Sequence, residues 1–155
     1  MTAPNEATEE LALVCRVRRV LAALPVTELV ETMRPLPVAP LGQTHPFVLG
    51  VAVIRGVPTP VVDPGALLDG AAGARPTRFV TLRAGTRTVA LAVEEVLGMR
   101  RFAGHTLHTL PALATETPMV GSLATIDEGL VLWLRSARLV SDELWRELDA
   151  AGGAA

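Results

Sequence analysis

The chain has 155 residues, of which 50% are hydrophobic, and a formal net charge of -2 at pH 7. This length suits one domain that buries its own core without help from a metal or a disulfide. The pI near 5.9 argues against a nucleic-acid-binding protein, because phosphate binding requires clustered positive charge.

Cys15 is the only cysteine, which excludes an internal disulfide and a zinc site built from several cysteines. We expect a buried and inert thiol, because it lies in an apolar stretch. The apolar runs are far shorter than the ~20 residues of a membrane-spanning helix. The sequence therefore predicts a cytoplasmic protein that does not insert into a membrane.

Taken in chain order, residues 1–10 are polar and acidic, and we expect them to be flexible. Glycine and proline then recur at short intervals. The segments between them are rich in valine, leucine and threonine, which is typical of many short strands. The first such strand is expected from Leu11 to Arg18. The chain is therefore predicted to be mostly β.

The stretch "FVLGVAVIRGVPTPVVD", Phe47 to Asp63, contains two prolines two residues apart. On a strand, the missing N–H groups of Pro58 and Pro60 face the same edge, so that edge cannot form a continuous ladder. Asp63 followed by Pro64 predicts the start of a short helix, with a carboxylate as the N-cap.

Residues 69–76 are rich in glycine and alanine and are predicted to connect two β subdomains. The stretch from Arg78 to Val93 then predicts a hairpin with one buried face and one face that carries Thr and Arg. A further strand is expected from Leu130 to Leu134. Residues 141–155 are predicted to form a C-terminal helix followed by a flexible tail, which is the closing "AAGGAA".

Residues with catalytic or metal-binding chemistry are scarce. Glu94 and Glu95 are adjacent, so on a strand they point to opposite faces and cannot act together as general acid and base. His105 and His108 lack a third ligand nearby, so no metal site is expected. Neither phosphate-binding glycine motif occurs, and no cofactor is expected.

Arg55 lies between Ile54 and Gly56 and allows two interpretations. Its side chain either covers the core or pairs with Glu31, as a purely structural residue, or it projects as a contact residue for a partner.

The order of these segments resembles the CheW-like domain of bacterial chemosensory systems. The most specific part of the resemblance is a run of glycine, arginine, proline and aspartate interspersed with hydrophobic residues in a fixed register. The matching residues are Gly50, Val51, Ile54, Arg55, Gly56, Pro60, Val61, Val62 and Asp63. Four of them, Gly50, Gly56, Pro60 and Asp63, are expected to be structural.

The resemblance implies two small five-stranded β-barrels packed together within residues 11–140, with short helices and no catalysis. It also implies an adaptor that couples the cytoplasmic tips of chemoreceptors to the regulatory domain of a CheA-type histidine kinase. Other CheW-like domains are further possible partners. The positions that match the receptor-binding residues of the family are Leu29, Glu31, Arg55 and Val96.

Two alternatives stay open at this stage. Arg18-Arg19 stands where the family has a glycine turn, and Arg135 follows the last strand. Both departures favour a divergent CheW-like protein that binds receptors but not the kinase and tunes the composition of the signalling array. A small-molecule enzyme on the same fold would need convergent polar groups in a pocket, and the sequence offers none.

Overall fold

The computed structural model describes residues 9–40, 47–69, 76–103, 120–126, 129–135, 140 and 142–153. These residues form short strands and two helices. In chain order the elements are β1 (Glu9–Val17), β2 (Val20–Pro25), β3 (Leu29–Met33), β4 (Val48–Ile54), β5 (Val57–Val62), α2 (Pro64–Asp69), β6 (Arg78–Ala84), β7 (Arg87–Val93), β8 (Glu95–Ala103), β9 (Val120–Ile126), β10 (Gly129–Leu134) and α4 (Asp142–Gly153).

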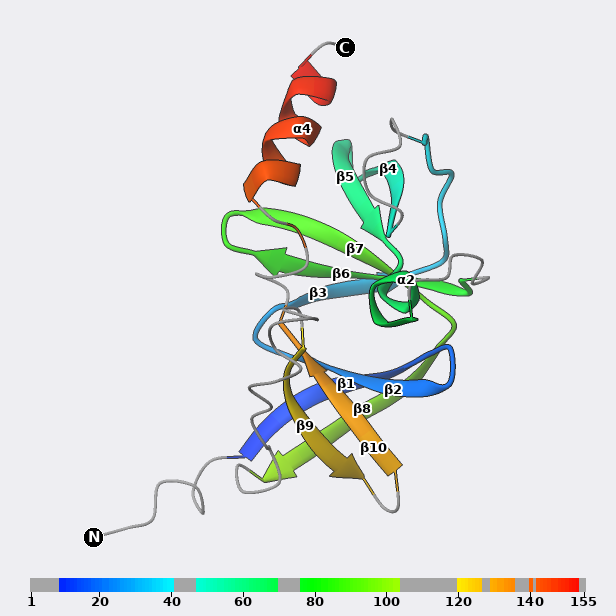
Figure 1. The fold of residues 1–155 in the computed structure, drawn as a ribbon, viewed down its shortest axis with the longest axis vertical. Helices are drawn as coiled ribbons and strands as arrows, with labels where there is room; N and C mark the ends of the chain where they lie inside the picture. The colour runs from blue at the N-terminus through cyan, green and yellow to red at the C-terminus, as the bar shows by residue number, and fades with distance from the viewer. Residues whose placement is uncertain are drawn as a thin grey trace, which may run out of the picture.

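The strands form two five-stranded sheets (Figure 1). Sheet A has the order β8-β1-β2-β10-β9, and sheet B has the order β3-β6-β7-β5-β4. The predicted fold class, mostly β in two five-stranded units with short helices and a C-terminal helix, is confirmed. The predicted barrels are not closed, because among the described residues the outer strands of neither sheet pair with each other and each unit is an open sheet.

The predicted boundary between the two halves is wrong. Residues 69–76 lie between β5 and β6, and both of these strands belong to sheet B. The chain instead crosses between the sheets after β2 and again at Glu94, between β7 and β8. A composition rich in glycine and alanine marks a connection, but the pairing of strands depends on contacts that are distant in sequence.

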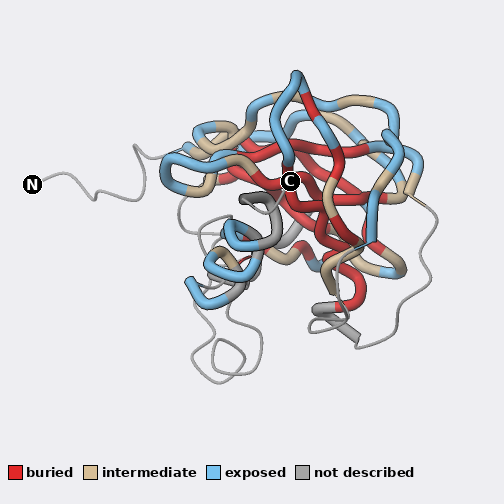
Figure 2. Tube along the Cα trace, turned by 90° about the horizontal axis from the view of Figure 1, so that it is seen from above, coloured by how far each residue is buried: buried red, intermediate tan, exposed pale blue. Residues whose placement is uncertain are grey.

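The core has three layers, because both faces of the central strands are buried. In β1, Leu13 and Cys15 face a cluster between the sheets, whereas Ala12 and Val14 face a cluster within sheet A. Strands β6 and β7 likewise have side chains on both faces buried: one face contributes to the cluster between the sheets, and the other contributes to a cluster within sheet B. Figure 2 shows the buried residues gathered at the centre of the molecule.

The β6–β7 hairpin forms as predicted, with its turn at Gly85 and Thr86, but its second face is not polar and exposed as expected. Phe79 and Ala92 are buried on that face, and Thr81 is buried with them. The reason is that apolar side chains of β4 and β5, such as Ala52 and Val61, pack against this face in one cluster. An isolated hairpin would leave the same face exposed to solvent.

Each edge strand is interrupted by a bulge or a shift of register: β8 and β9 in sheet A, and β3 and β4 in sheet B. The outer side of β4 is further covered by a bridge between Ala39 and Val51. Such interruptions keep exposed edges from pairing with other chains.

The ends of the described chain are more regular than expected. Glu9 and Glu10 belong to β1 and pair with the end of β8, and α4 continues through Ala150 to Gly153. The other residues predicted to be flexible, 1–8 and 154–155, lie outside the described residues.

Helix α4 follows the last strand of sheet A but contacts sheet B. Arg87 of β7 bonds both carboxylate oxygens of Asp149 at 2.6 Å, and its guanidinium lies 4.7 Å from the ring centre of Trp145. Figure 1 shows the helix beside sheet B, at the end of the molecule away from sheet A.

Candidate partner-binding site

The hairpin between β4 and β5 places Arg55 at a two-residue turn. Ile54 pairs with Val57, and both turn residues have positive φ, 51° for Arg55 and 79° for Gly56. This combination defines a type I′ turn, which matches the twist of the strands. Glycine accepts the conformation readily, whereas a left-handed backbone costs arginine about 1–2 kcal/mol. Strain of this kind is often found at functional sites.

The prolines of β5 behave as the sequence predicts. The N–H and C=O of Val51 both bond Ala39, so Val51 and its partner Pro60 form a pair without ladder hydrogen bonds between β4 and β5. The nitrogen of Pro60 therefore faces away from β4, and so does that of Pro58, two residues earlier. Pairing of β5 with β7 begins only at Val61, beyond both prolines.

Gly50 and Asp63 have separate structural roles in the same stretch. Gly50 has φ 144°, and a Cβ there would lie 2.8 Å from the carbonyl carbon of Ala39. Asp63 is buried and caps α2, because its Oδ1 accepts a bond of 2.9 Å from the Gly65 amide. The predicted N-cap is confirmed.

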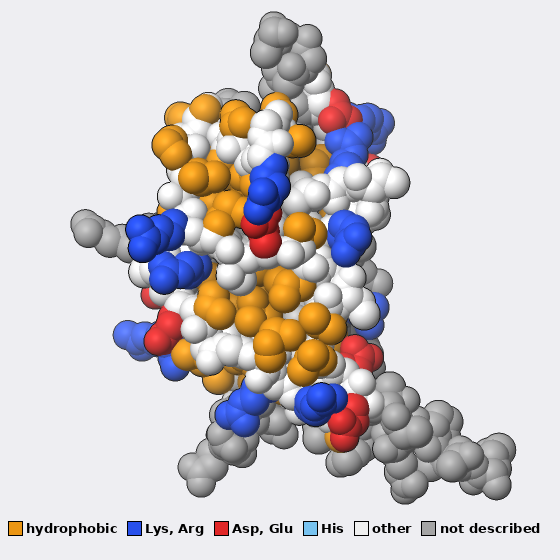
Figure 3. Space-filling view, turned by 180° about the vertical axis from the view of Figure 1, so that it is seen from behind, with side chains coloured by type: hydrophobic (Ala, Val, Ile, Leu, Met, Phe, Trp, Pro, Cys, Tyr) orange, Lys and Arg blue, Asp and Glu red, His pale blue; other side chains and the backbone are white. Residues whose placement is uncertain are grey.

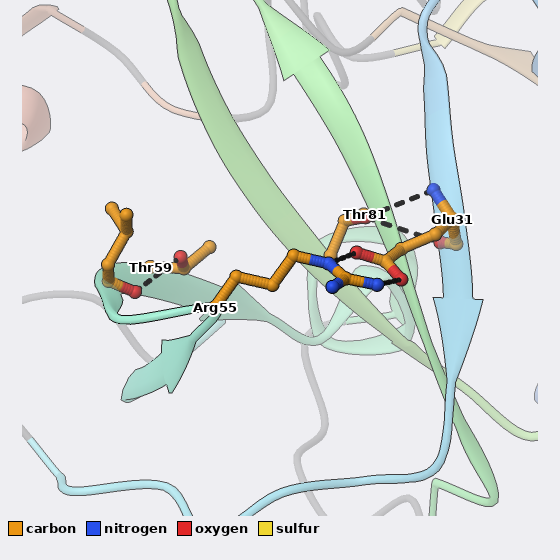
Figure 4. Close-up of polar contacts among 5 residues, drawn as sticks. Glu31, Arg55, Thr59 and Thr81 are labelled. Atoms are coloured by element: carbon orange, nitrogen blue, oxygen red, sulfur yellow. Dashed lines mark hydrogen bonds and ion pairs between the residues drawn. The ribbon is translucent and has the colours of Figure 1, made fainter.

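Arg55 and Glu31 form a bidentate ion pair on the surface (Figure 4). Arg55 Nε lies 2.6 Å from Glu31 Oε2, and Nη2 lies 2.7 Å from Oε1. The arginine side chain is nevertheless 76% exposed. The hydrogen bond from Arg55 holds the pKa of Glu31 below its ordinary value and raises the pKa of Arg55. Arg55 thus pairs with Glu31, as the structural interpretation expects, and its side chain also projects into solvent; its role as a contact residue for a partner stays a prediction.

Thr81 holds Glu31 in place from the neighbouring strand. Its hydroxyl accepts a bond of 3.2 Å from the Glu31 amide and donates one of 3.3 Å to the Glu31 carbonyl (Figure 4). These bonds lie beside the bulge of β3, where Val30 is the extra residue between the pairs made by Leu29 and Glu31. The side chain of Thr81 thus supports the backbone that the bulge would otherwise leave poorly paired.

The other two expected contact residues come from different sheets. Leu29 on β3 and Val96 on β8 are each partly buried and pack against the same cluster between the sheets. The structure therefore brings Leu29 and Val96 to one apolar cluster, and it joins Glu31 to Arg55 directly.

Sequence reasoning missed three exposed apolar side chains on the same edge strands. Val30 on β3 is 47% exposed, and Leu97 and Met99 on β8 are 46% and 43% exposed. Val30 and Leu97 are the extra residues of their bulges, and Gly98 has φ 127°. A glycine inside a strand pattern is the one signal that could have revealed the second bulge.

Hydrophobic side chains form two broad areas on the face in Figure 3, and a pair of opposite charges lies between them. Such exposed apolar area around a few charged groups is typical of protein-binding surfaces.

Other chemistry is limited in the part of the chain that the structure describes. Burial raises the pKa of the Cys15 thiol to about 12, so it is protonated at neutral pH. No group of three His, Cys, Asp or Glu residues within the described ranges could hold a metal ion, and His105 and His108 lie outside those ranges. None of the described helices has the length and apolarity that crossing a membrane requires.

Comparison with known proteins gives one family and one fold. The family model of the CheW-like domain matches residues 11–144. No curated protein matches the chain. Among solved structures, the scaffolding protein TtCheW from Thermoanaerobacter tengcongensis superimposes with a TM-score of 0.73 at 17% identity, over 83% of this chain and 90% of that one. This identity is low, so the similarity concerns the fold.

Proposed function

Because the chain belongs to the CheW-like domain family, we propose that it couples the cytoplasmic tips of chemoreceptors to a CheA-type histidine kinase. The family and the fold are those of chemotaxis scaffolding proteins. The role is that of a cytoplasmic adaptor without catalysis, with other CheW-like domains as further partners.

The observation that carries the proposal is the exposed Arg55–Glu31 pair. A guanidinium on a strained turn, fixed by a bidentate carboxylate and still 76% exposed, is positioned before any partner arrives. Such pre-organisation lowers the entropy cost of binding. A receptor tip is a helical hairpin, and it would need apolar anchors and a charge to set its register.

Leu29 and Val96 are the proposed apolar anchors. Both lie at the margin of the cluster between the sheets, one on each sheet. A partner that contacts both would therefore span the two sheets. The exposed Val30 and Leu97 beside them enlarge the apolar area available to it.

The alternative is a protein that binds receptors but not the kinase. It depends on three arginines at strand ends, Arg18, Arg19 and Arg135, which would hinder kinase binding. The structure removes Arg18 from this argument, because its side chain turns inward to Asp63. Arg19 and Arg135 remain exposed. We therefore propose that kinase binding is retained but is weakened by these two arginines.

The test is the affinity for a purified receptor-tip fragment. We expect Arg55→Ala and Arg55→Asn each to weaken binding by about tenfold to a hundredfold, as for an interface anchor. Asparagine is favoured in a type I′ turn, so Arg55→Asn removes the guanidinium while retaining the hairpin. The thermal unfolding midpoint should stay close to that of the wild type.

The matched control is Arg34→Ala, which removes another exposed arginine, near the end of β3. It should bind as the wild type does. If both Arg55 variants bound normally and Arg55→Ala melted early, Arg55 would be a structural residue and the proposed site would be wrong.

A further inference from the structure

Arg18 lies where the two sheets meet. It occupies the turn between β1 and β2 in sheet A, with φ 59°, a conformation that arginine rarely adopts. Its amide donates a hydrogen bond to a carboxylate oxygen of Glu94, the residue at which the chain passes from sheet B to sheet A. The Glu94 amide in turn donates to the Arg16 carbonyl at 3.0 Å.

The Arg18 side chain reaches across to sheet B. Its Nη2 lies 3.3 Å from Oδ2 of Asp63, whose side chain is only 2% exposed. The ion pairs of Arg16 with Glu95 and of Arg101 with Glu9 stay within sheet A, by contrast. The pair of Arg18 and Asp63 thus joins the β1–β2 turn to the junction of β5 and α2.

The Arg18 side chain packs closely against Gly65 at the start of α2. A Cβ on Gly65 would lie 2.9 Å from Cγ of Arg18 and 3.0 Å from its Cζ. An added methyl group would displace the guanidinium without changing any charge. A substitution at Gly65 therefore tests the position of the Arg18 side chain by steric contact alone, because it leaves the charges of Arg18 and Asp63 unchanged.

Most of the contact between the sheets is apolar. Apolar burial is non-directional, so it holds two surfaces together without fixing how they are turned. Hydrogen bonds and ion pairs depend on angle and distance, and they supply the missing direction. We propose that Arg18 is a positioning residue that fixes the orientation of sheet A against sheet B.

A consequence for binding rests on the proposed function. The expected receptor anchors come from both sheets, so their relative position depends on this orientation. If only about a tenth of the molecules keep the correct orientation, the apparent Kd rises about tenfold.

The experiment measures, by double electron–electron resonance, the distance between spin labels on two introduced cysteines. One is at Thr86, in the β6–β7 turn of sheet B, and the other is at Arg101, in β8 of sheet A. Both positions are exposed, and the native Cys15 is fully buried and so escapes labelling in the folded protein. We expect a narrow distance distribution in the labelled parent protein. Arg18→Ala and Gly65→Ala should each widen or shift it.

Arg19→Ala is the matched control, because Arg19 is the exposed neighbour in the same turn. It should leave the distribution unchanged. In the Arg18→Ala background, Gly65→Ala should add no further change, since no guanidinium remains to be displaced. If Arg18→Ala did not fold, Gly65→Ala would carry the test alone, because it keeps the arginine.

Distributions of equal width and position in the parent, Arg18→Ala and Gly65→Ala would overturn the proposal, whatever the receptor affinity. For Gly65→Ala tested alone, an unchanged distribution has the same meaning. Failure of the proposed function gives a different result: the wild type would not bind the receptor fragment, while the distance distributions still changed.

Discussion

Asp63 combines two interactions that substitutions can separate. Its Oδ1 caps α2 through Gly65, and its Oδ2 receives Arg18. Asparagine is an equally good N-cap but carries no charge. We expect Asp63→Asn to lower the free energy of unfolding by about 1–2 kcal/mol, through the weakened charge pair. Asp63→Ala should cost about 3 kcal/mol or more, because the cap is lost as well and residue 63 no longer offers Arg18 an acceptor oxygen.

Urea denaturation of the two variants measures both costs. Glu95→Gln, which breaks the exposed pair with Arg16, should change stability very little and serves as the control. Equal losses for Asp63→Asn and Asp63→Ala would show that the cap contributes nothing.

Glu31 gives the protein a predictable response to acid. The hydrogen bond from Arg55 lowers the pKa of Glu31 from its ordinary value of 4.5. A carboxyl whose pKa is lower in the folded state adds stability that is fully present above the unfolded pKa and is lost as pH falls through the folded pKa. The stability difference between the wild type and Glu31→Gln should therefore be constant above about pH 5 and shrink below pH 4.5.

Chemical denaturation at a series of pH values between 3 and 7 measures this difference. A difference that grew as the pH fell would mean that the pair does not form in solution.

At the scale of the strand, substitutions at Gly50 and Gly85 distinguish the cost of backbone strain from the cost of steric contact. Both have positive φ, 144° and 68°, but a Cβ would meet the Ala39 backbone only at Gly50, whereas Gly85 faces open space. We expect Gly85→Ala to cost about 1–2 kcal/mol from strain alone. Gly50→Ala adds the collision with a neighbouring backbone, and about 3 kcal/mol or more is expected in total.

Denaturant unfolding of the two variants compares these costs. Hydrogen exchange at the Ala39 and Val51 amides should in addition rise only in Gly50→Ala, because those amides form the bridge that the methyl group disrupts. Equal costs for the two substitutions would show that the segment at Ala39 moves aside freely.

At the scale of the whole molecule, we expect the balance between the proposed partners to depend on which faces carry unpaired charge. The expected receptor-binding residues retain their charge pair and their apolar neighbours. Arg19 and Arg135 are exposed, and neither forms an ion pair with a described residue. Cations that must be desolvated at an interface weaken it unless the partner supplies an acid.

We therefore expect tighter binding to a receptor-tip fragment than to a kinase-regulatory fragment when each is titrated separately. The double substitution Arg19→Ala and Arg135→Ala should strengthen kinase binding and leave receptor binding unchanged. Tight kinase binding together with undetectable receptor binding would show that the two faces have been assigned the wrong way round.

The sequence by itself determined the features that depend on neighbouring residues. Alternation along Arg78–Val93 predicted the hairpin, the spacing of Pro58 and Pro60 predicted a broken ladder, and Asp63 before Pro64 predicted the capped helix. Each depends on backbone geometry within a few residues, so local chemistry is sufficient. The register of the motif from Gly50 to Asp63 likewise indicated the family.

Tertiary structure alone decided which strands share a sheet, and with that the position of the site. The connector at 69–76 looked like a boundary, yet β5 and β6 share sheet B, because pairing is fixed by contacts between residues far apart in the chain. The bulges that expose Val30 and Leu97 depend on register with a neighbouring strand. Arg18 looked like a surface cation until the fold placed Asp63, which is 45 residues away, within reach of its guanidinium.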